Sequence, residues 1–487
     1  MSSNRLASNP SYEQMLAQLD AIKKIQRAEG PVSAAVRQDR LQRGMNLFIN
    51  HLDEIMDAGS QDFGGRPRVI VAQLDGHGSV AAMKYNKKNV KKWMKPSTRS
   101  TAIPFNLFGG KTEVRYQPKG VIGISGTWNA SLFTVFAPLA GVLAAGNRAI
   151  IKPSDLSPRM GEFLQKRLHE YFDPMEVSLV TGGMETAQDF TRLPFDHLVY
   201  TGGGSIAKHI MRAAAENLVP LTLELGGKSP TIFGKSANLD QAMYNLVTGK
   251  AQNNGQICVS PDTIYVPKSM LEDFVKRFKT IYAATFGAAV ITDNKDLTPA
   301  INERHLNRVE SYIQDAKAKG ARIELAGPDS APDVNNRRRP MRLVIDPPRD
   351  ALICSEEIFG SAALIRTYDD IKTVVREIQQ GDYPLALYYF GKDKAEEEYI
   401  LQNTLSGGVV VNDVLMHAAM NDAPFGGVGA SGMGRYNGKE GFLEFSHHRT
   451  IYRTGWWDPQ QKMGLKPPFN DPEKTIKTIV QGLKSPV

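Results

Sequence analysis

Hydrophobic positions near the N-terminus recur with the period of an α-helix. Gaps of four and three residues alternate through the set Leu41, Met45, Phe48, Leu52 and Ile55. Side chains at these gaps share one face of a helix. The spacing therefore predicts one amphipathic helix that carries all five residues, the second of two helices that open the chain.

Short apolar runs then alternate with longer segments of helical pattern. Strands are predicted at residues 113–117, 121–124, 148–152, 177–180, 197–200 and 221–225. Helices are predicted at residues 132–145, 157–171, 184–192 and 205–217. From residue 121 on, this alternation predicts right-handed crossovers and a parallel, doubly wound sheet, in which ligands bind at the carboxyl ends of the strands.

A second α/β segment follows the first. Its predicted strands cover residues 231–233, 263–266 and 343–345, and its predicted helices cover residues 239–253 and 270–282. The fold class is therefore α/β, with a doubly wound parallel sheet and a second α/β unit. A chain of 487 residues has room for two or three such domains.

Composition and charge narrow the function classes. The chain is 41% hydrophobic and 23% charged, as ordinary globular proteins are. Its net charge of +8 could attract nucleic acid, an anionic membrane or a phosphate-bearing cofactor. The basic runs at residues 84–95 and 337–342 are expected to be solvated surface. No zinc-ligand or RNA-binding signature accompanies them, so we expect neither a metal site nor a nucleic-acid partner.

Membrane insertion and secretion are not expected either. Residues 121–147 carry no charge, but polar residues and Pro138 interrupt them, which indicates a strand, a polar loop and a buried helix. The N-terminus has no apolar segment typical of a secretory signal. Two cysteines, Cys258 and Cys354, are too few for a disulfide framework, so a reducing, cytoplasmic location is expected.

One of the two cysteines is a candidate nucleophile. Cys258 follows Asn253, Asn254 and Gly255, polar turn-forming residues that suit an exposed site. Cys354 follows two apolar residues and is expected in the core. The alternative for Cys258 is also a small core residue, the usual role of a single cysteine in a reducing compartment.

Three further segments carry candidate chemistry. Glu224 ends an apolar strand just before two glycines, where parallel sheets place functional groups, although it could be a plain surface carboxylate. Asn129, in a polar loop, could donate to a developing oxyanion or simply cap a turn. Glycines at 202–204 feed a predicted helix and could present backbone N–H groups to phosphate, but they lack the G-x-G-x-x-G spacing.

Together these segments resemble the aldehyde dehydrogenase superfamily from about residue 30 to residue 455. The 34 residues from Glu224 to Cys258 are also the spacing of that family. Residues 411–434 are most similar to its class 3 branch, and within it to coniferyl aldehyde dehydrogenase-like proteins. The similar segments are residues 128–129, 152–154, 201–202, 224–228, 255–258, 357–360 and 424–427.

The resemblance implies a domain organisation. It implies an NAD-binding domain at residues 1–99 and 119–225 and a catalytic domain at residues 226–430. It also implies a small oligomerisation arm at residues 100–118 and 440–455, with a C-terminal tail at residues 456–487. Members of this superfamily are commonly homodimers or homotetramers.

The resemblance also implies roles for residues. Cys258 is the implied nucleophile, Asn129 and the Cys258 N–H hold the oxyanion, and Glu224 activates water. Lys152 and Asp155 are implied contacts of the adenosine ribose, and Glu357 of the nicotinamide ribose. The complete implied cofactor set is Trp128, Lys152, Ser154, Asp155, Gly202, Gly203, Gly204, Ser205, Leu225, Glu357 and Phe359.

Some positions depart from the family pattern. Gly203 stands where Ser or Thr is usual, and Ala207 where the cofactor loop usually has a second glycine. Ser361 replaces a usual proline, and Thr127 precedes Trp128 where Pro or Ala is common. No catalytic group is lost, but the choice between NAD and NADP stays open. We expect NAD, because Asp155 should repel a 2′-phosphate.

The function implied is the NAD-dependent oxidation of an aldehyde to a carboxylic acid, through a thiohemiacetal and a thioester on Cys258. Bulky or aromatic aldehydes are expected, with Ala130, Leu132, Phe133 and Met416 as a channel wall; alternatively, residues 132–133 only begin a buried helix. One alternative function is that of a CoA-acylating relative, which would not need Glu224 to activate water. Another is a non-enzymatic binding protein, which would have no need of the complete catalytic set.

Overall fold

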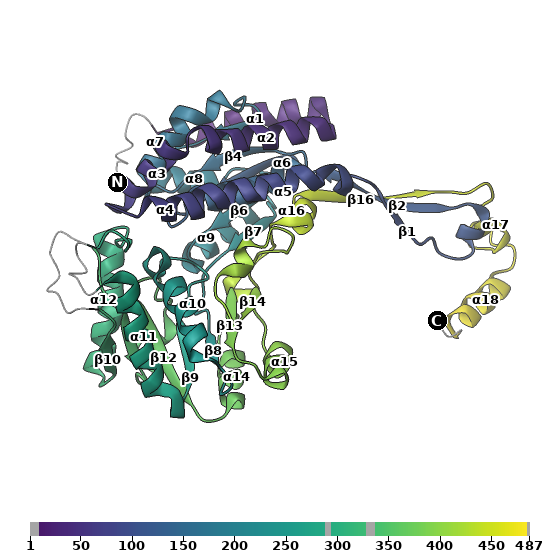
Figure 1. The fold of residues 1–487 in the computed structure, drawn as a ribbon. Helices are drawn as coiled ribbons and strands as arrows, with labels where there is room; N and C mark the ends of the chain where they lie inside the picture. The colour runs from purple at the N-terminus through teal and green to yellow at the C-terminus, as the bar shows by residue number, and fades with distance from the viewer. Residues whose placement is uncertain (1–8, 288–293, 328–336, 485–487) are drawn as a thin grey trace.

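A six-stranded sheet forms the core of the N-terminal domain. The computed structural model describes residues 9–287, 294–327 and 337–484 (Figure 1). The strand order is β15-β7-β6-β3-β4-β5, with only β15 antiparallel. This confirms the predicted parallel sheet. Its strands are β3 (Val121–Ser125), β4 (Arg148–Lys152), β5 (Val177–Leu179), β6 (His197–Thr201), β7 (Leu221–Glu224) and β15 (Gly432–Met433).

Helices connect these strands and cover the sheet, and the predicted ones are confirmed to within a few residues. They are α6 (Phe133–Ala144), α7 (Pro158–Arg167), α8 (Met184–Thr191) and α9 (Gly204–Ala215). Nearly every residue of α6 is buried, so the uncharged segment is a strand, a loop and a core helix as expected. Within the described ranges, no helix has the length and hydropathy needed to cross a membrane.

The prediction of a single helix through Ile55 is wrong. Helix α2 (Ala34–Asn50) ends before His51, and α3 (Leu52–Phe63) begins after it. The backbone of His51 (φ −126°, ψ 24°) redirects the chain, so Leu52 leaves the apolar face and is 37% exposed. The other helices of this layer are α1 (Tyr12–Glu29), α4 (Arg68–Val71), η1 (Ala72–His77) and α5 (Gly78–Trp93).

The two basic runs differ in their environment. The lysines of residues 84–95 lie mostly exposed on α5, as expected. The expectation of solvated surface is wrong for residues 337–342. Arg337 donates to the carbonyls of Ala300 and Phe63, and buried Arg342 pairs with Glu310. These guanidinium groups satisfy backbone carbonyls and a carboxylate inside the protein, which a charge pattern alone does not reveal.

A seven-stranded sheet forms the second domain, in the order β10-β11-β12-β9-β8-β13-β14, with only β10 antiparallel. Its strands are β8 (Thr231–Phe233), β9 (Thr263–Pro267), β10 (Arg322–Leu325), β11 (Arg342–Ile345), β12 (Ala362–Tyr368), β13 (Ala386–Phe390) and β14 (Gly408–Val411). Its helices are α10 (Leu239–Ala251), α11 (Leu271–Phe286), α12 (Glu303–Ala318), α13 (Leu352–Ser355), α14 (Ile371–Gln380) and α15 (Lys394–Asn403).

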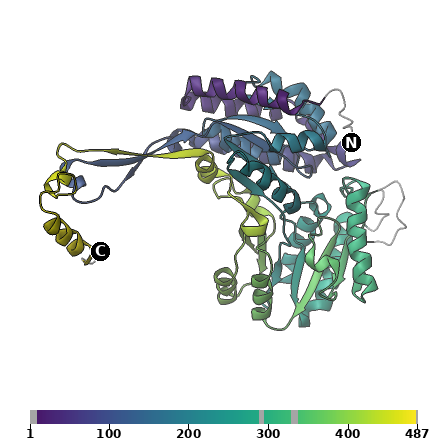
Figure 2. The same ribbon diagram turned by 180° about the vertical axis from the view of Figure 1, so that it is seen from behind.

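A three-stranded antiparallel sheet projects from the body as an arm (Figures 1 and 2). It consists of β1 (Ser97–Arg99), β2 (Lys111–Pro118) and β16 (Ser446–Arg453), and short helix α16 (Gly438–Glu444) joins it to the first domain. The strand β1 precedes the implied arm boundary at residue 100. Beyond the arm lie α17 (Pro459–Lys462) and α18 (Pro472–Lys484), within the segment expected to be a tail.

Candidate active site

Three candidate catalytic residues meet where the two domains join. Glu224 is the last residue of β7, and Asn129 lies in the loop after β3. The Asn129 side-chain nitrogen donates to the Gln256 carbonyl at 3.0 Å, and Asn253 donates to the Asn129 carbonyl at 3.2 Å. Because Gln256 is two residues before Cys258, these bonds hold the amide of the first domain against the thiol-bearing loop of the second.

The turn that presents Cys258 is built from unusual backbone angles. Asn253, Asn254 and Gly255 all have positive φ, at 48°, 54° and 76°. Asparagine tolerates this left-handed region better than most residues do. A β-carbon at Gly255 would lie 2.3 Å from the Gly360 carbonyl oxygen, so only glycine fits there. The sequence N-N-G therefore fixes the direction in which the chain reaches Cys258.

Glu224 is a buried carboxyl with an altered acidity. It is 1% exposed, and this burial raises its pKa to about 7. The Cys258 thiol and the Thr201 hydroxyl lie beside it and act in the opposite direction, without cancelling the effect of burial. A carboxyl with this pKa exchanges its proton near neutral pH, as a general base must.

Cys258 is half-buried beside that carboxyl. Burial, and then the negative charge of Glu224, raise the pKa of the thiol well above its ordinary value. The protonated thiol is therefore the favoured form of the resting side chain. A reaction at Cys258 needs a base in contact with it, and Glu224 occupies that place.

Groups suited to a dinucleotide follow the ends of neighbouring strands. Lys152 ends β4, is 2% exposed and donates to the Pro153 carbonyl at 3.0 Å, while Asp155 is exposed. Burial lowers the pKa of Lys152. Ser154 accepts a hydrogen bond from the Leu156 N–H at 3.2 Å and is half-buried. A buried ammonium with one backbone acceptor keeps donors for ribose hydroxyl groups.

The glycine loop leads into the N-terminus of α9. Gly203 is the N-cap and offers no side chain to the first turn, and Ser205 is exposed. A β-carbon at Gly203 or Gly204 would meet no heavy atom within 4 Å, so open space adjoins the helix terminus. Gly202 precedes them at the end of β6. Free N–H groups beside open space fit a phosphate-bearing ligand.

The other end of a dinucleotide would meet Glu357 and Phe359. A β-carbon at Gly226 would lie 2.1 Å from a Glu357 carboxylate oxygen, so the carboxylate rests on the glycine backbone beside Leu225. Burial and the charge of Asp262 raise the pKa of Glu357 to about 8. The Phe359 ring packs edge-on against Trp128, with 5.4 Å between centroids. These residues therefore fit the nicotinamide half that the sequence assigned to them.

The profile of the aldehyde dehydrogenase family matches residues 7–451. The chain belongs to the aldehyde dehydrogenase family. It is 43% identical over 447 residues to a probable coniferyl aldehyde dehydrogenase of Caulobacter vibrioides, covering 91% of this chain and 92% of that one. It is 42% identical to a coniferyl aldehyde dehydrogenase of a Pseudomonas species, over 90% of both chains.

Solved structures agree with this family. A substrate-bound AldH of Staphylococcus aureus superposes with a TM-score of 0.88 at 31% identity, over 96% of this chain and 99% of that one. A Mycobacterium tuberculosis aldehyde dehydrogenase in complex with NAD⁺ gives a TM-score of 0.81 at 27% identity, over 92% of this chain and 91% of that one. The chain is therefore an aldehyde dehydrogenase, with the α/β fold of that family.

This aldehyde dehydrogenase also has a positioning pair that its sequence does not reveal. Lys228 forms an ion pair with Asp262 and donates to the carbonyls of Ile353 and Glu356, both at 2.9 Å. The second oxygen of Asp262 accepts from the Ile358 N–H at 2.7 Å. The pair thus holds the loop on both sides of Glu357. Lys228 follows the Gly226-Gly227 pair directly, but its partners lie far along the sequence.

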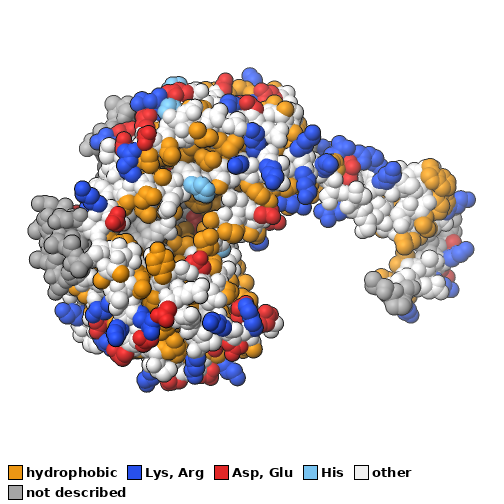
Figure 3. All heavy atoms as spheres, viewed as in Figure 1, with side chains coloured by type: hydrophobic (Ala, Val, Ile, Leu, Met, Phe, Trp, Pro, Cys, Tyr) orange, Lys and Arg blue, Asp and Glu red, His pale blue; other side chains and the backbone are white. Residues whose placement is uncertain are grey.

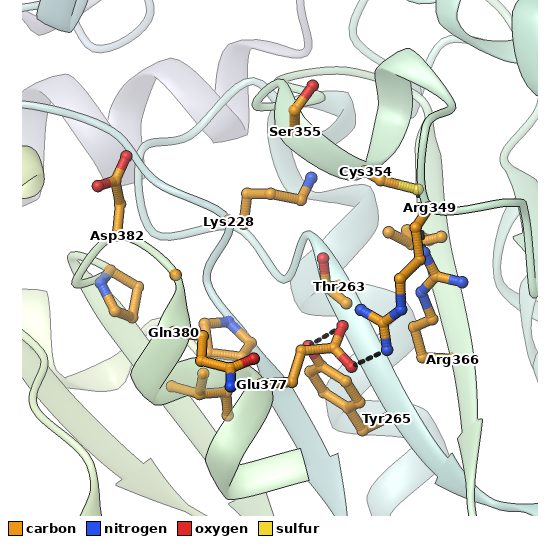
Figure 4. A pocket seen from close by; sticks show the side chains of 15 residues that line it. Lys228, Thr263, Tyr265, Arg349, Cys354, Ser355, Arg366, Glu377, Gln380 and Asp382 are labelled. Atoms are coloured by element: carbon orange, nitrogen blue, oxygen red, sulfur yellow. Dashed lines mark hydrogen bonds and ion pairs between the residues drawn. The ribbon is translucent and has the colours of Figure 1, made fainter. Parts of the chain in front are cut away.

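The sequence predicted that Cys354 is a core residue, and this prediction is wrong. It lies half-buried in the wall of a surface cavity of about 380 Å³ (Figure 4). Its sulfur accepts from Arg366 at 3.1 Å and donates to the Pro348 carbonyl at 3.3 Å. Short helix α13 turns the thiol toward the surface there. Cys258 does not line this cavity, so the two thiols of the aldehyde dehydrogenase have separate environments.

The implied channel wall is only partly present. Leu132 belongs to the main hydrophobic core, and Phe133 packs against Gly78 of α5. Both residues therefore lie at the start of a buried helix, which was the alternative to a place in the channel wall. Ala130 is buried and Met416 is exposed. Among the described residues, no group of three His, Cys, Asp or Glu side chains is arranged to hold a metal ion.

Proposed function

We propose that this aldehyde dehydrogenase oxidises an aldehyde to a carboxylic acid through an acyl group carried on Cys258, with NAD as electron acceptor. The observation that carries the proposal is the buried carboxyl of Glu224, which has a pKa of about 7. This carboxyl lies beside the Cys258 thiol, which burial keeps protonated. At neutral pH the Glu224 carboxylate can take a proton first from the thiol and later from water.

The first step forms a bond between the Cys258 sulfur and the aldehyde carbon, while the thiol proton passes to Glu224. The carbonyl oxygen becomes an oxyanion. Asn129 has a second amide hydrogen beyond the one bonded to Gln256, and this hydrogen and the Cys258 N–H are the donors that would stabilise it. The product of this step is a thiohemiacetal.

The thiohemiacetal carbon then loses its hydrogen with two electrons, and a thioester remains. A nicotinamide dinucleotide supplies the hydride acceptor when bound. Glu224 releases the thiol proton to solvent and then takes a proton from water as the water oxygen attacks the thioester carbon. The carbon–sulfur bond breaks, the carboxylic acid leaves, and the sulfur of Cys258 is free for the next aldehyde.

The cofactor proposal rests on the separate groups described above. Lys152 and Asp155 would hold the adenosine ribose, the N-terminus of α9 the diphosphate, and Glu357 the nicotinamide ribose. Lys152 alone could also accept a 2′-phosphate, so the exposed carboxylate of Asp155 is the reason for proposing NAD over NADP. The structural relative from Mycobacterium tuberculosis was solved with NAD⁺.

A bulky or aromatic aldehyde is the proposed substrate. Two curated relatives are named coniferyl or probable coniferyl aldehyde dehydrogenases. Aromatic side chains also lie near Cys258: the Tyr388 hydroxyl bonds to the carbonyl of Val259, and Phe425 packs on Tyr436 with 5.5 Å between ring centroids. Aromatic side chains near the reacting sulfur would favour a ring over a methyl group, because more apolar surface would leave water.

We also propose that the arm joins copies of this chain into a homodimer or homotetramer. Apolar side chains gather on the arm and tail (Figure 3), among them Ile103, Leu107 and Trp456, which is 79% exposed. One face of α18 carries Ile476, Ile479, Val480 and Leu483, all exposed. Exposed apolar surface of this extent is typical of a protein interface.

A spectrophotometric assay of NADH tests the enzymatic proposal. Purified protein is incubated with NAD and either an aromatic aldehyde or acetaldehyde, with and without CoA. We expect NADH without CoA and kcat/KM about 10–200-fold higher for the aromatic aldehyde. NADH that requires CoA would establish the acylating reaction instead, and NADP as the better acceptor would refute the cofactor proposal.

A further inference from the structure

Tyr436 lies at the catalytic junction without a role in the chemistry described so far. The antiparallel pairing of β15 with β7 places Gly432 opposite Glu224, and Tyr436 follows four residues later in the chain. Tyr436 then forms two backbone hydrogen bonds with Phe425, at 2.7 and 2.8 Å. The backbone is fixed on both sides, so the phenol has a defined position.

The phenol is buried and its hydroxyl group is unpaired. Tyr436 is 1% exposed, and its ring packs against Phe425. Among the residues that the structure describes, none hydrogen-bonds to the Tyr436 hydroxyl or to the Oε1 atom of Glu224. Phenylalanine would fill the same space without burying an unpaired hydroxyl, which destabilises a protein. A hydroxyl retained at this place indicates a partner that arrives with the reaction.

The charges of the reacting groups act on the Tyr436 hydroxyl. Burial, followed by the charges of Glu224 and Cys258, raises the pKa of Tyr436 well above its ordinary value. The side chain therefore stays a neutral phenol that can both donate and accept a hydrogen bond. Tyr388, the other buried phenol near Cys258, already donates to the Val259 carbonyl and accepts from the Leu415 N–H. Tyr436 is thus the phenol with bonding capacity left.

We propose that the Tyr436 hydroxyl, together with Glu224, holds the water molecule that hydrolyses the acyl group on Cys258. This inference rests on the function proposed above. One water hydrogen passes to the Glu224 carboxylate, and the other is held by the phenol oxygen. The water oxygen then bonds to the acyl carbon, and the electrons of the broken carbon–sulfur bond return to Cys258. No oxidant takes part in this step.

The variant Tyr436→Phe tests the role with the least disturbance, because it removes one unpaired oxygen and keeps the ring. Acid-quenched samples from steady-state turnover are examined by mass spectrometry for the fraction of enzyme acylated, alongside the rates of acylation and NADH formation. We expect acylation within twofold of wild type, deacylation slower by about tenfold, and a larger acylated fraction. Added hydroxylamine, which attacks the thioester without a positioned water, should restore turnover.

The control is Tyr282→Phe, the same change at a fully buried phenol of α11 that packs against Phe286. It should leave all of these rates unchanged. The inference is overturned if Tyr436→Phe deacylates at the wild-type rate, or if acylation and deacylation fall equally, since the second result indicates a packing role. Wild-type enzyme that never becomes acylated would refute the proposed function itself, and the role of Tyr436 with it.

Discussion

Burial rather than charge pairing sets the acidity of the residues that matter most. Glu224 is a carboxyl whose pKa burial raises to about 7, so it is protonated below that pH and ionised above it. As a base it can work only when ionised. We therefore expect the rate of deacylation to rise with pH through about 7 and then level off.

The variant Glu224→Gln keeps the shape of the side chain and removes the base. Steady turnover should fall by about 10²–10⁴-fold, and the limb of the pH–rate profile near pH 7 should disappear, because glutamine does not titrate. A profile that keeps this limb in Glu224→Gln would assign the base to another group. Glu357, with a pKa of about 8, would then be the next residue to test.

The two cysteines allow a matched comparison of two serine variants. Cys258→Ser should abolish turnover while folding and cofactor binding remain, because the serine hydroxyl is far less acidic than a thiol. Cys354→Ser, in the wall of the surface cavity, should turn over at the wild-type rate. Steady-state kinetics and cofactor titration by fluorescence measure both. Turnover of Cys258→Ser within tenfold of wild type would remove this thiol from the mechanism.

We expect the choice of cofactor to depend on a single side chain as well. Asp155 is exposed three residues after Lys152, where its carboxylate would repel a 2′-phosphate. Asp155→Ser should shift the ratio of kcat/KM for NAD and NADP toward NADP, with little change in the KM of the aldehyde. Glu162→Ser, which removes an exposed carboxylate of α7, is the control. An unchanged ratio in Asp155→Ser would mean that Asp155 does not discriminate.

At the scale of elements, the parallel strands of the first domain were predictable because each is a short apolar run bounded by polar turns. The second domain was less predictable: the strands β10, β12, β13 and β14 and the amphipathic helix α14 between β12 and β13 were all missed. The break at His51 was invisible because the four-three spacing continues across it. Local backbone angles, not periodicity, decide such a break.

The loop that carries Glu357 depends on partners distant in sequence. Lys228→Met should release its two backbone carbonyls and leave Asp262 uncompensated. We expect the KM for NAD to rise by about tenfold, with a smaller effect on the KM of the aldehyde, because Glu357 is the proposed contact of the nicotinamide ribose. Lys235→Met, at an exposed position of the same domain, is the control. Equal effects on both KM values would indicate general unfolding of the site.

The arm and tail expose apolar side chains that the described residues of a single subunit do not cover. Deleting residues 454–487 removes α17, α18 and their exposed apolar side chains but leaves the three-stranded sheet complete. If this surface is an interface, light scattering should show a smaller assembly or a weaker one, with dissociation at a higher protein concentration. Full-length protein that is monomeric at the same concentration would contradict the proposed homodimer or homotetramer.

At the scale of the whole molecule, the site exists only where the domains meet. Asn129 comes from one domain and Cys258 from the other, and the bond between Asn129 and Gln256 joins them. Sequence motifs were enough to name these residues and Glu224. They could not reveal the raised pKa values, the Lys228–Asp262 pair or the unpaired hydroxyl of Tyr436, because burial and contact between distant segments produce all three.

The most direct test of the account is to locate the acyl group. Wild-type enzyme is mixed with NAD and an aromatic aldehyde and quenched in acid during turnover, and its peptides are mapped by mass spectrometry. The account predicts an acyl group on the peptide that contains Cys258 and not on the one that contains Cys354. NADH formation without acylation of Cys258, or acylation of Cys354 in its place, would contradict it.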